Sequence, residues 1–292
     1  MSLTTMKDIL TKANEGNYAV GAFVSIEHIY TECILEAAER TNTPVLVMLP
    51  ARTLGTMKNP DCHIRCTLDM LRSASVPAAL VLDHGKSFDI CMKAIHLGFT
   101  GVMFDGSMLS MEENIAQTRK VVEVAHACGV SVEGEIGHVG GAEGPNANPN
   151  GYIADSDMYT TVDEAICFAK KSGVDVMAVA FGTVHGVYKG EPKLDIDRLK
   201  AIKSAVNIPI AMHGGSGLPE AEYRKAVAGG VNKINFFTEM SFAASQEVKR
   251  VLEINDYDAH MHFSKLTDPA REKMISIMMN DIGVFGTQKV SK

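Results

Sequence analysis

The stretch at residues 78–107, AALVLDHGKSFDICMKAIHLGFTGVMFDGS, contains the pattern that decides the fold. Its apolar run at 78–82 is followed by a segment of helical period and then by a second apolar run at 101–104. Short apolar runs without polar alternation are typical of strands that are buried on both faces. A helix between two such strands indicates a parallel sheet.

The same alternation continues in both directions along the chain, so we expect eight strands, each followed by a helix. The expected strands are residues 19–24, 44–49, 78–82, 101–104, 130–133, 176–181, 208–212 and 231–235. Eight such units without a break in composition favour a closed α/β barrel, the (β/α)8 TIM barrel, over an open sheet. Extra N- and C-terminal helices are expected around residues 5–15 and 268–282. No linker is visible, so residues 1–292 are expected to form a single domain.

The composition excludes several classes of protein. Of the 292 residues, 46% are hydrophobic and 22% are charged, which excludes a disordered chain. The net charge is −7 and no basic run exceeds two residues, so we expect neither nucleic acid nor a membrane as partner. The N-terminus has no apolar segment of a secretory signal, which favours a cytoplasmic protein. The six cysteines are therefore expected to be reduced thiols.

Polar side chains gather where the expected strands end. In such barrels the chemistry takes place at the carboxyl ends of the strands. The residues at these ends are Asp83, His84, Asp105, Glu133, Glu135, His185, His213 and Asn235. Three imidazoles at three strand ends suit a catalytic zinc site, which takes three protein ligands and leaves a position open. Asp105 and Glu135 are expected to support these ligands or to form an alternative metal position.

A single histidine at a strand end is more often a rim residue than a ligand, so the prediction depends on finding three together. Cys62, His63 and Cys66 lack a second ligand pair and are expected to form one face of a helix. The remaining histidines are given no role: His28, His96, His126, His138, His260 and His262.

Three loops carry further signals. Residues 212–219, MHGGSGLP, and residues 235–238, NFFT, follow the last two expected strands. Glycines allow backbone N–H groups to approach an anion, and Pro219 is well placed to open a helix, so these turns suit a phosphate. Tight turns without a ligand are the alternative. The stretch 137–159 is long and rich in glycine, as lids and binding loops are.

Six blocks of sequence, in order, resemble the class II, zinc-dependent ketose-bisphosphate aldolases, such as the fructose- and tagatose-bisphosphate aldolases. The blocks are LDHGKS at 82–87, VMFDGS at 102–107, VEGEIG at 132–137, GTVHGVY at 182–188, HGGSG at 213–217 and KIN at 233–235. The resemblance covers nearly the whole chain. It implies reversible cleavage of a ketose 1-phosphate or ketose 1,6-bisphosphate to dihydroxyacetone phosphate and an aldehyde.

The resemblance also assigns roles to residues. It implies that His84, His185 and His213 hold Zn²⁺, with Asp105 and Glu135 near a second metal position. It implies that Asp83 is the acid/base at the aldehyde oxygen and that Glu143, on the long loop, removes the substrate proton. The segments that would cradle dihydroxyacetone phosphate, together with a Na⁺ or K⁺ ion, contain Gly186, Gly214, Gly215, Ser216, Asn235, Phe236, Phe237 and Thr238.

The chain departs from the family at the positions that receive the second phosphate of a bisphosphate. Members that use a bisphosphate usually have Asn, Ser and Arg there, where this chain has Val24, Pro50 and Ser264. Val and Pro offer no donor, and Ser cannot form the two parallel hydrogen bonds of Arg. We therefore expect an aldehyde half that differs from glyceraldehyde 3-phosphate, with Arg52 or Lys265 as candidates for a replacement charge.

Two other functions are compatible with the sequence. A Schiff-base aldolase would use Lys233, although the three histidines would then be unexplained. A non-catalytic relative would bind zinc or a sugar phosphate without turnover. The resemblance further implies a homodimer or homotetramer.

Overall fold

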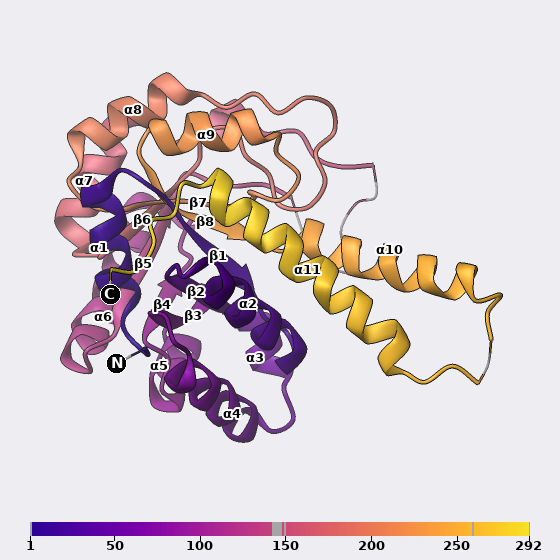
Figure 1. The fold of residues 1–292 in the computed structure, drawn as a ribbon. Helices are drawn as coiled ribbons and strands as arrows, with labels where there is room; N and C mark the ends of the chain where they lie inside the picture. Colours follow the sequence, from indigo (N-terminus) through magenta and orange to yellow (C-terminus); the bar gives the residue numbers. More distant parts are fainter. Residues whose placement is uncertain (1, 142–147, 149, 259, 292) are drawn as a thin grey trace.

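The computed structural model describes residues 2–141, 148, 150–258 and 260–291. Its eight parallel strands form a closed barrel in chain order, β1 to β8, which confirms the predicted (β/α)8 architecture (Figure 1). The strands are β1 Val20–Val24, β2 Val45–Pro50, β3 Ala78–Gly85, β4 Gly101–Phe104, β5 Ser131–Ile136, β6 Val176–Val179, β7 Ile210–Met212 and β8 Val231–Phe236.

Most of the helices surround the barrel (Figure 1), and apolar residues of these helices join the core cluster formed with the strands. They are α1 Met6–Gly16, α2 His28–Thr41, α3 Ala51–Thr56, α4 Pro60–Ser73, α5 Phe88–Leu97, α6 Met111–Ala127, α7 Val162–Ser172, α8 Ile196–Ala205, α9 Glu220–Ala228, α10 Thr238–Ile254 and α11 Ser264–Val284. Capping boxes form at the starts of α6 and α7, the first between Ser110 and Glu113 and the second between Thr161 and Glu164. The short α3, directly after β2, was not expected from the sequence.

Four strands continue beyond their predicted ends, β2 by the single residue Pro50. β3 reaches Gly85, β5 reaches Ile136 and β8 reaches Phe236. The polar residues that were expected at or just after the ends of these strands therefore lie within the strands. β6 and β7 are shorter than predicted. The pairing of β3 with β4 is irregular between Leu82 and Gly85, and His84 there has φ +49°. A left-handed conformation at a non-glycine residue is uncommon and often marks a functional position.

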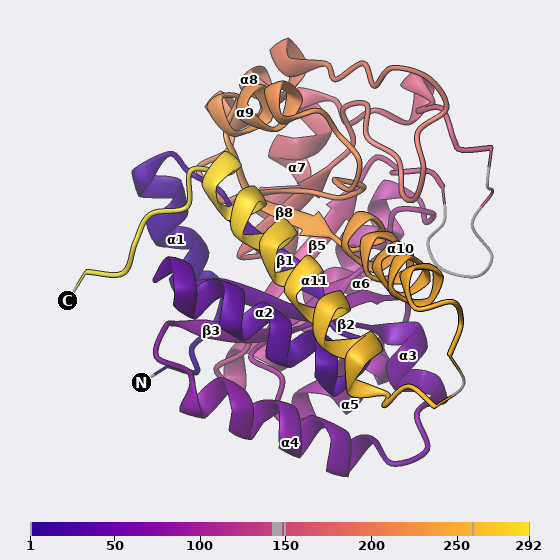
Figure 2. The same ribbon diagram turned by 45° about the vertical axis from the view of Figure 1, so that its right-hand side comes forward.

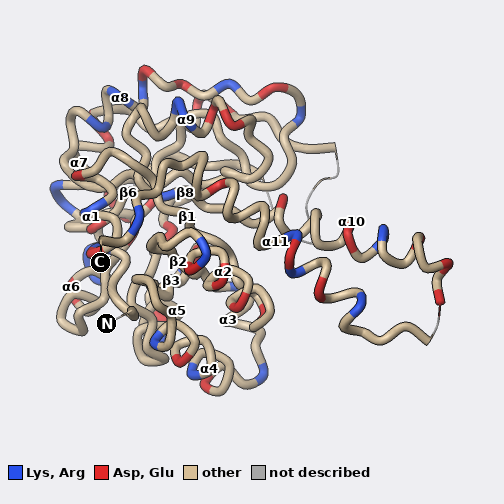
Figure 3. Tube along the Cα trace, in the orientation of Figure 1, with Lys and Arg blue, Asp and Glu red and all other residues tan. Residues whose placement is uncertain are grey.

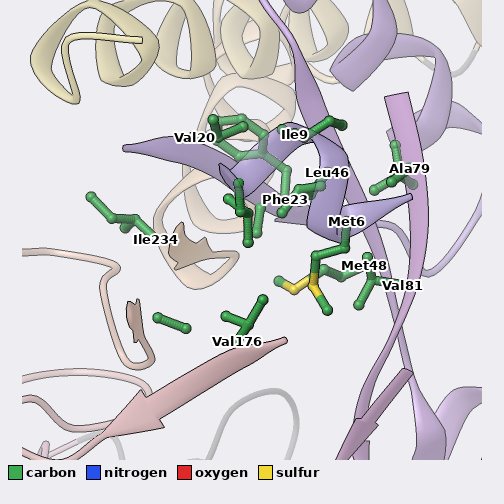
Figure 4. Close-up of a cluster of buried hydrophobic side chains, with 14 of the residues drawn as sticks. Met6, Ile9, Val20, Phe23, Leu46, Met48, Ala79, Val81, Val176 and Ile234 are labelled. Atoms are coloured by element: carbon green, nitrogen blue, oxygen red, sulfur yellow. The ribbon is translucent and has the colours of Figure 1, made fainter. Parts of the chain in front are cut away.

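The helix α1 closes the amino-terminal end of the barrel. It contacts β1, β3, β5 and β8, and its buried face includes Met6 and Ile9. Figure 4 shows these two side chains beside Phe23 and Leu46, next to residues of other strands. The apolar core is therefore sealed at this end, which leaves the polar residues to the opposite end of the strands.

The helices α10 and α11 form an antiparallel hairpin that projects from the barrel (Figures 1 and 2). Along it, α11 packs against α10 and α2. Lys and Arg are interspersed with Asp and Glu over the outer helices (Figure 3), which agrees with the absence of long basic runs in the sequence. Among the described helices, none is long and apolar enough to cross a membrane.

Candidate metal centre and active site

The three predicted histidines meet at the carboxyl end of the barrel. His84 comes from β3, and His185 and His213 follow β6 and β7. One nitrogen from each ring lies within 4.8 Å of the other two, and Nδ1 of His213 is 3.0 Å from Nε2 of His84. The ring centroids are 4.7 to 5.9 Å apart. The barrel thus brings together side chains that are up to 129 positions apart in the sequence.

Two carboxylates adjoin the imidazoles. Nδ1 of His84 is 2.9 Å from Oδ2 of Asp105 and 3.8 Å from Oε2 of Glu135. His84, Asp105 and Glu135 form a second group with metal-ligand spacing. Oε2 of Glu135 is buried and accepts no hydrogen bond from the described residues, although it is 4.0 Å from Nδ1 of His213. A buried carboxylate oxygen without a donor is costly unless a cation faces it.

The electrostatics of the site favour a cation. Burial lowers the pKa of His84, but the nearby carboxylates of Asp83, Asp105 and Glu135 outweigh burial and raise it to about 10. Burial, and then the charge of Asp105, raise the pKa of Glu135. Burial and the two neighbouring imidazoles hold the pKa of His185 well below its usual value, so His185 is neutral and has a free lone pair. A neutral imidazole next to a buried carboxylate oxygen that accepts no hydrogen bond from the described residues fits a divalent metal such as zinc.

A second buried network supports His213. Its Nε2 is 2.7 Å from Oε1 of Glu133, whose other oxygen is 2.8 Å from Nζ of Lys233. Burial raises the pKa of Glu133, but Lys233 and His213 lower it to about 2. With Nε2–H donated to Glu133, Nδ1 of His213 is the nitrogen that presents a lone pair to the other imidazoles.

The Glu133–Lys233 pair spans the barrel from β5 to β8, and both side chains are fully buried. Lys233 also donates to Oδ1 of Asn235 at 2.7 Å, and Nδ2 of Asn235 donates to Oδ1 of Asp83 at 3.2 Å. Lys233 therefore fixes the orientation of the Asn235 amide. The amide in turn holds one oxygen of Asp83 in place through its hydrogen bond. The sequence analysis named Glu133 and Lys233 separately but did not predict that they pair. Their pairing could have been suspected because each is a charged residue inside an otherwise apolar strand.

An open cavity of about 600 Å³ extends from His84 and His185. It is lined by Pro50, Ala51, Arg52, Asp83, His84, Lys86, Ser87, Ile90, Asp105, Glu135, His138, Val139, Gly141 and His185. His138, which received no role from the sequence, is in this wall, and its Nδ1 is 3.3 Å from the hydroxyl of Ser107. That hydroxyl donates to Asp105 at 2.7 Å, so Ser107 connects His138 to the carboxylate beside His84.

The glycine-rich turns after β7 and β8 lie on the other side of the centre. The hydroxyl oxygen of Ser216 accepts the N–H groups of Phe237 and Thr238 at 2.9 and 3.0 Å, so its own hydrogen can be donated elsewhere. Gly214 has φ +65°, and a Cβ there would lie 2.3 Å from the carbonyl oxygen of Val184, so only glycine fits. A hollow of about 680 Å³ is lined in part by Gly186, Ser216 and Thr238. Pro219 precedes α9 as predicted.

Several predicted residues occupy other environments. Val24 is buried in the core, while Pro50 forms part of the cavity wall. Ser264 is exposed and is the first residue of α11, not a residue before it, and it does not line the cavity. Phe236 and Phe237 are buried, and their rings pack near Phe23 and Tyr30. Glu143 lies outside the described residues.

Comparisons with known proteins give matches over nearly the whole chain. The family model described as fructose-bisphosphate aldolase class-II matches residues 4–289. A Staphylococcus aureus protein and a Staphylococcus epidermidis protein, both named fructose-bisphosphate aldolase, are each 38% identical over 294 residues, covering 100% of both chains. The crystal structure of the YdjI aldolase from Escherichia coli K12 is similar, with a TM-score of 0.83 and 27% identity over 98% of both chains.

Proposed function

Because the chain belongs to the class II fructose-bisphosphate aldolase family, we propose that it is a zinc-dependent aldolase acting on a ketose 1-phosphate or ketose 1,6-bisphosphate. The reaction reversibly gives dihydroxyacetone phosphate and an aldehyde. The observation that carries the zinc assignment is the group of three imidazoles beside the unpaired oxygen of Glu135. We further propose one aldolase domain over residues 1–292, since a single family model matches almost the whole chain.

His84, His185 and His213 would hold the catalytic zinc. When bound, zinc supplies a Lewis acid that polarises the substrate carbonyl. Glu133 keeps His213 in the tautomer that such a ligand needs, and Asp105 does the same for His84. His84, Asp105 and Glu135 would form a second metal position.

Asp83 would transfer the proton at the aldehyde oxygen. It lines the cavity, and Asn235 holds its Oδ1, so the carboxylate has a fixed orientation next to His84. In the direction of cleavage it accepts the hydroxyl proton of the aldehyde half, and in the direction of condensation it returns that proton. Glu143 would remove the proton from dihydroxyacetone phosphate, a role that rests on the family resemblance alone.

The phosphate of dihydroxyacetone phosphate would bind at the glycine-rich turns. The free hydroxyl hydrogen of Ser216 and the amino-terminal end of α10 suit an anion. Gly186, Gly214 and Gly215 let the backbone approach closely, and a Na⁺ or K⁺ ion would accompany the phosphate. Asn235 and Thr238 complete the set on the side of β8.

The aldehyde half would differ from glyceraldehyde 3-phosphate. The donors that the family uses for a second phosphate are replaced by Val24, which is buried and apolar, and by Pro50 in the cavity wall. Of these two residues only Pro50 lines the cavity, and a phosphate dianion in contact with it would lose hydration without gaining a hydrogen bond.

The remaining proposals concern the cell and the assembly. All six cysteines are free, as expected for a reducing cytoplasm. The exposed apolar side chains of Phe242, Ile254, Tyr257 and Phe263 near the α10–α11 hairpin support a homodimer or homotetramer.

The test is a panel of ketose 1-phosphates and ketose 1,6-bisphosphates, with release of dihydroxyacetone phosphate measured with and without a chelator. We expect chelator-sensitive release, with monophosphates cleaved better than bisphosphates. Efficient cleavage of bisphosphates would refute the altered aldehyde half but keep the aldolase. Release that is indifferent to chelator and stopped by borohydride would instead favour a Schiff base on Lys233. If no substrate is cleaved and dihydroxyacetone phosphate exchanges no proton with solvent, the chain is a non-catalytic relative.

A further inference from the structure

Two cationic side chains, those of Arg52 and Lys86, line the same cavity as His84 and His185. Arg52 lies in the first turn of α3, two residues after Pro50 at the end of β2, and Lys86 directly follows β3. Pro50 and Asp83 are partners in the register of these neighbouring strands. The two side chains therefore leave adjacent strand ends, and both border the same space as Asp83, His84 and His185.

Neither cation has a carboxylate partner among the described residues. Of the nine arginines of the chain, seven form ion pairs there: Arg40, Arg72, Arg119, Arg198, Arg224, Arg250 and Arg271. Arg52 and the surface residue Arg65 form none. None of the three carboxylates of the cavity pairs with Arg52 or Lys86: Asp105 pairs with His84, Asp83 accepts from Asn235, and Oε2 of Glu135 lies 3.8 Å from Nδ1 of His84. Arg52 and Lys86 are thus left to meet an anion that enters from solvent.

We infer that Arg52 and Lys86 form the subsite for a negatively charged terminal group on the aldehyde half of the substrate. This inference rests on the proposed aldolase function and adds the charge of the aldehyde to it. Pro50 and Ala51 give the same cavity an apolar part of its wall, which suits the carbon chain of the substrate. The charged end then reaches the guanidinium and ammonium groups, whereas Val24 and Pro50 provide no donor for it.

A carboxylate and a phosphate could bind Arg52 and Lys86 through the same kind of interaction. Both are oxyanions that accept charge-assisted hydrogen bonds from a guanidinium group. Condensation of dihydroxyacetone phosphate with three aldehydes distinguishes them: neutral glyceraldehyde, glyceraldehyde 3-phosphate and an aldehyde acid of similar length. The variants are Arg52→Gln, Lys86→Gln and the double variant. The matched control is Arg65→Gln combined with Lys120→Gln, which removes two exposed charges outside this cavity.

For the double variant we expect kcat/KM to fall about 10- to 100-fold with one or both anionic aldehydes and less than about threefold with glyceraldehyde. The single variant Arg52→Lys should lose less kcat/KM with the anionic aldehydes than Arg52→Gln does. Added salt should lower the ratio of kcat/KM for an anionic aldehyde to that for glyceraldehyde in the wild type. Loss with the aldehyde acid alone identifies a carboxylate. Loss with glyceraldehyde 3-phosphate alone identifies a phosphate and refutes the proposed difference from glyceraldehyde 3-phosphate. Either supports the subsite.

Equal losses with charged and neutral aldehydes, or a loss no greater than that of the control, would overturn the inference while leaving the aldolase intact. Failure of the proposed function has a different signature, because the wild type would then show no chelator-sensitive proton exchange into dihydroxyacetone phosphate. That exchange needs no aldehyde, so it reports on the metal centre independently of Arg52 and Lys86.

Discussion

Replacement of Lys233 by methionine should destabilise the protein strongly without removing a catalytic group. Lys233 and Glu133 have side chains that are 1% and 0% exposed, and their charged atoms are 2.8 Å apart. Lys233→Met therefore leaves a buried carboxylate with only His213 as its partner. Removal of one member of a buried ion pair typically costs about 3–5 kcal/mol. For 292 residues, an unfolding entropy near 2.1 cal/mol/K per residue converts this into a fall in Tm of about 5–8 °C.

The assay is thermal unfolding followed by circular dichroism, with and without zinc. The control is Lys249→Met, since Lys249 and Glu253 form an exposed pair at 3.7 Å, and its Tm should change by no more than about 1 °C. The double variant Lys233→Met/Glu133→Gln should recover more than half of the loss, because the remaining amide is neutral and can still accept from His213.

Two results would refute this reasoning. If the losses of the two single variants add in the double variant, the ion pair is not the source of the destabilisation. If Lys233→Met folds with a normal Tm but has no activity, and the wild type is indifferent to chelator, Lys233 acts chemically as a Schiff base. We expect instead that Lys233→Met retains chelator-sensitive activity below its lowered Tm.

Three further predictions concern the site and its surroundings. Asp83→Asn should keep chelator-sensitive proton exchange into dihydroxyacetone phosphate but slow cleavage about 10²- to 10⁴-fold; parallel losses of both would contradict a role restricted to the aldehyde oxygen. His185→Ala should bind less zinc after dialysis than the wild type, as measured by elemental analysis, whereas His126→Ala on α6 should bind as much. Burial, and then Glu239, raise the pKa of Asp281 to about 8, so the folded state retains a proton that the unfolded chain releases near pH 4. Stability should therefore fall as pH rises from about 4 to 8, and urea unfolding of Asp281→Asn should show a smaller fall; identical pH profiles would count against the raised pKa.

Much of the barrel was predictable because local patterns determine it. Each strand is a short apolar run, and the two capping boxes satisfy the first N–H groups of α6 and α7 through residues three positions apart. The strand ends were less predictable. β3 continues through Asp83 because its register with β2 extends to Pro50, and a pairing between strands is not visible in either strand alone.

The sequence by itself determined the eight units, the residue types at the strand ends and the expectation that three histidines would meet there. Closure of a barrel in chain order makes that meeting a consequence of topology. Only the tertiary structure decided the surroundings of each polar group. Glu133 pairs with Lys233 across the barrel, one oxygen of Glu135 accepts no hydrogen bond from the described residues, and Arg52 and Lys86 line one cavity. The physical reason is that hydrogen bonds and ion pairs depend on distances of a few ångströms and on burial, which only packing fixes.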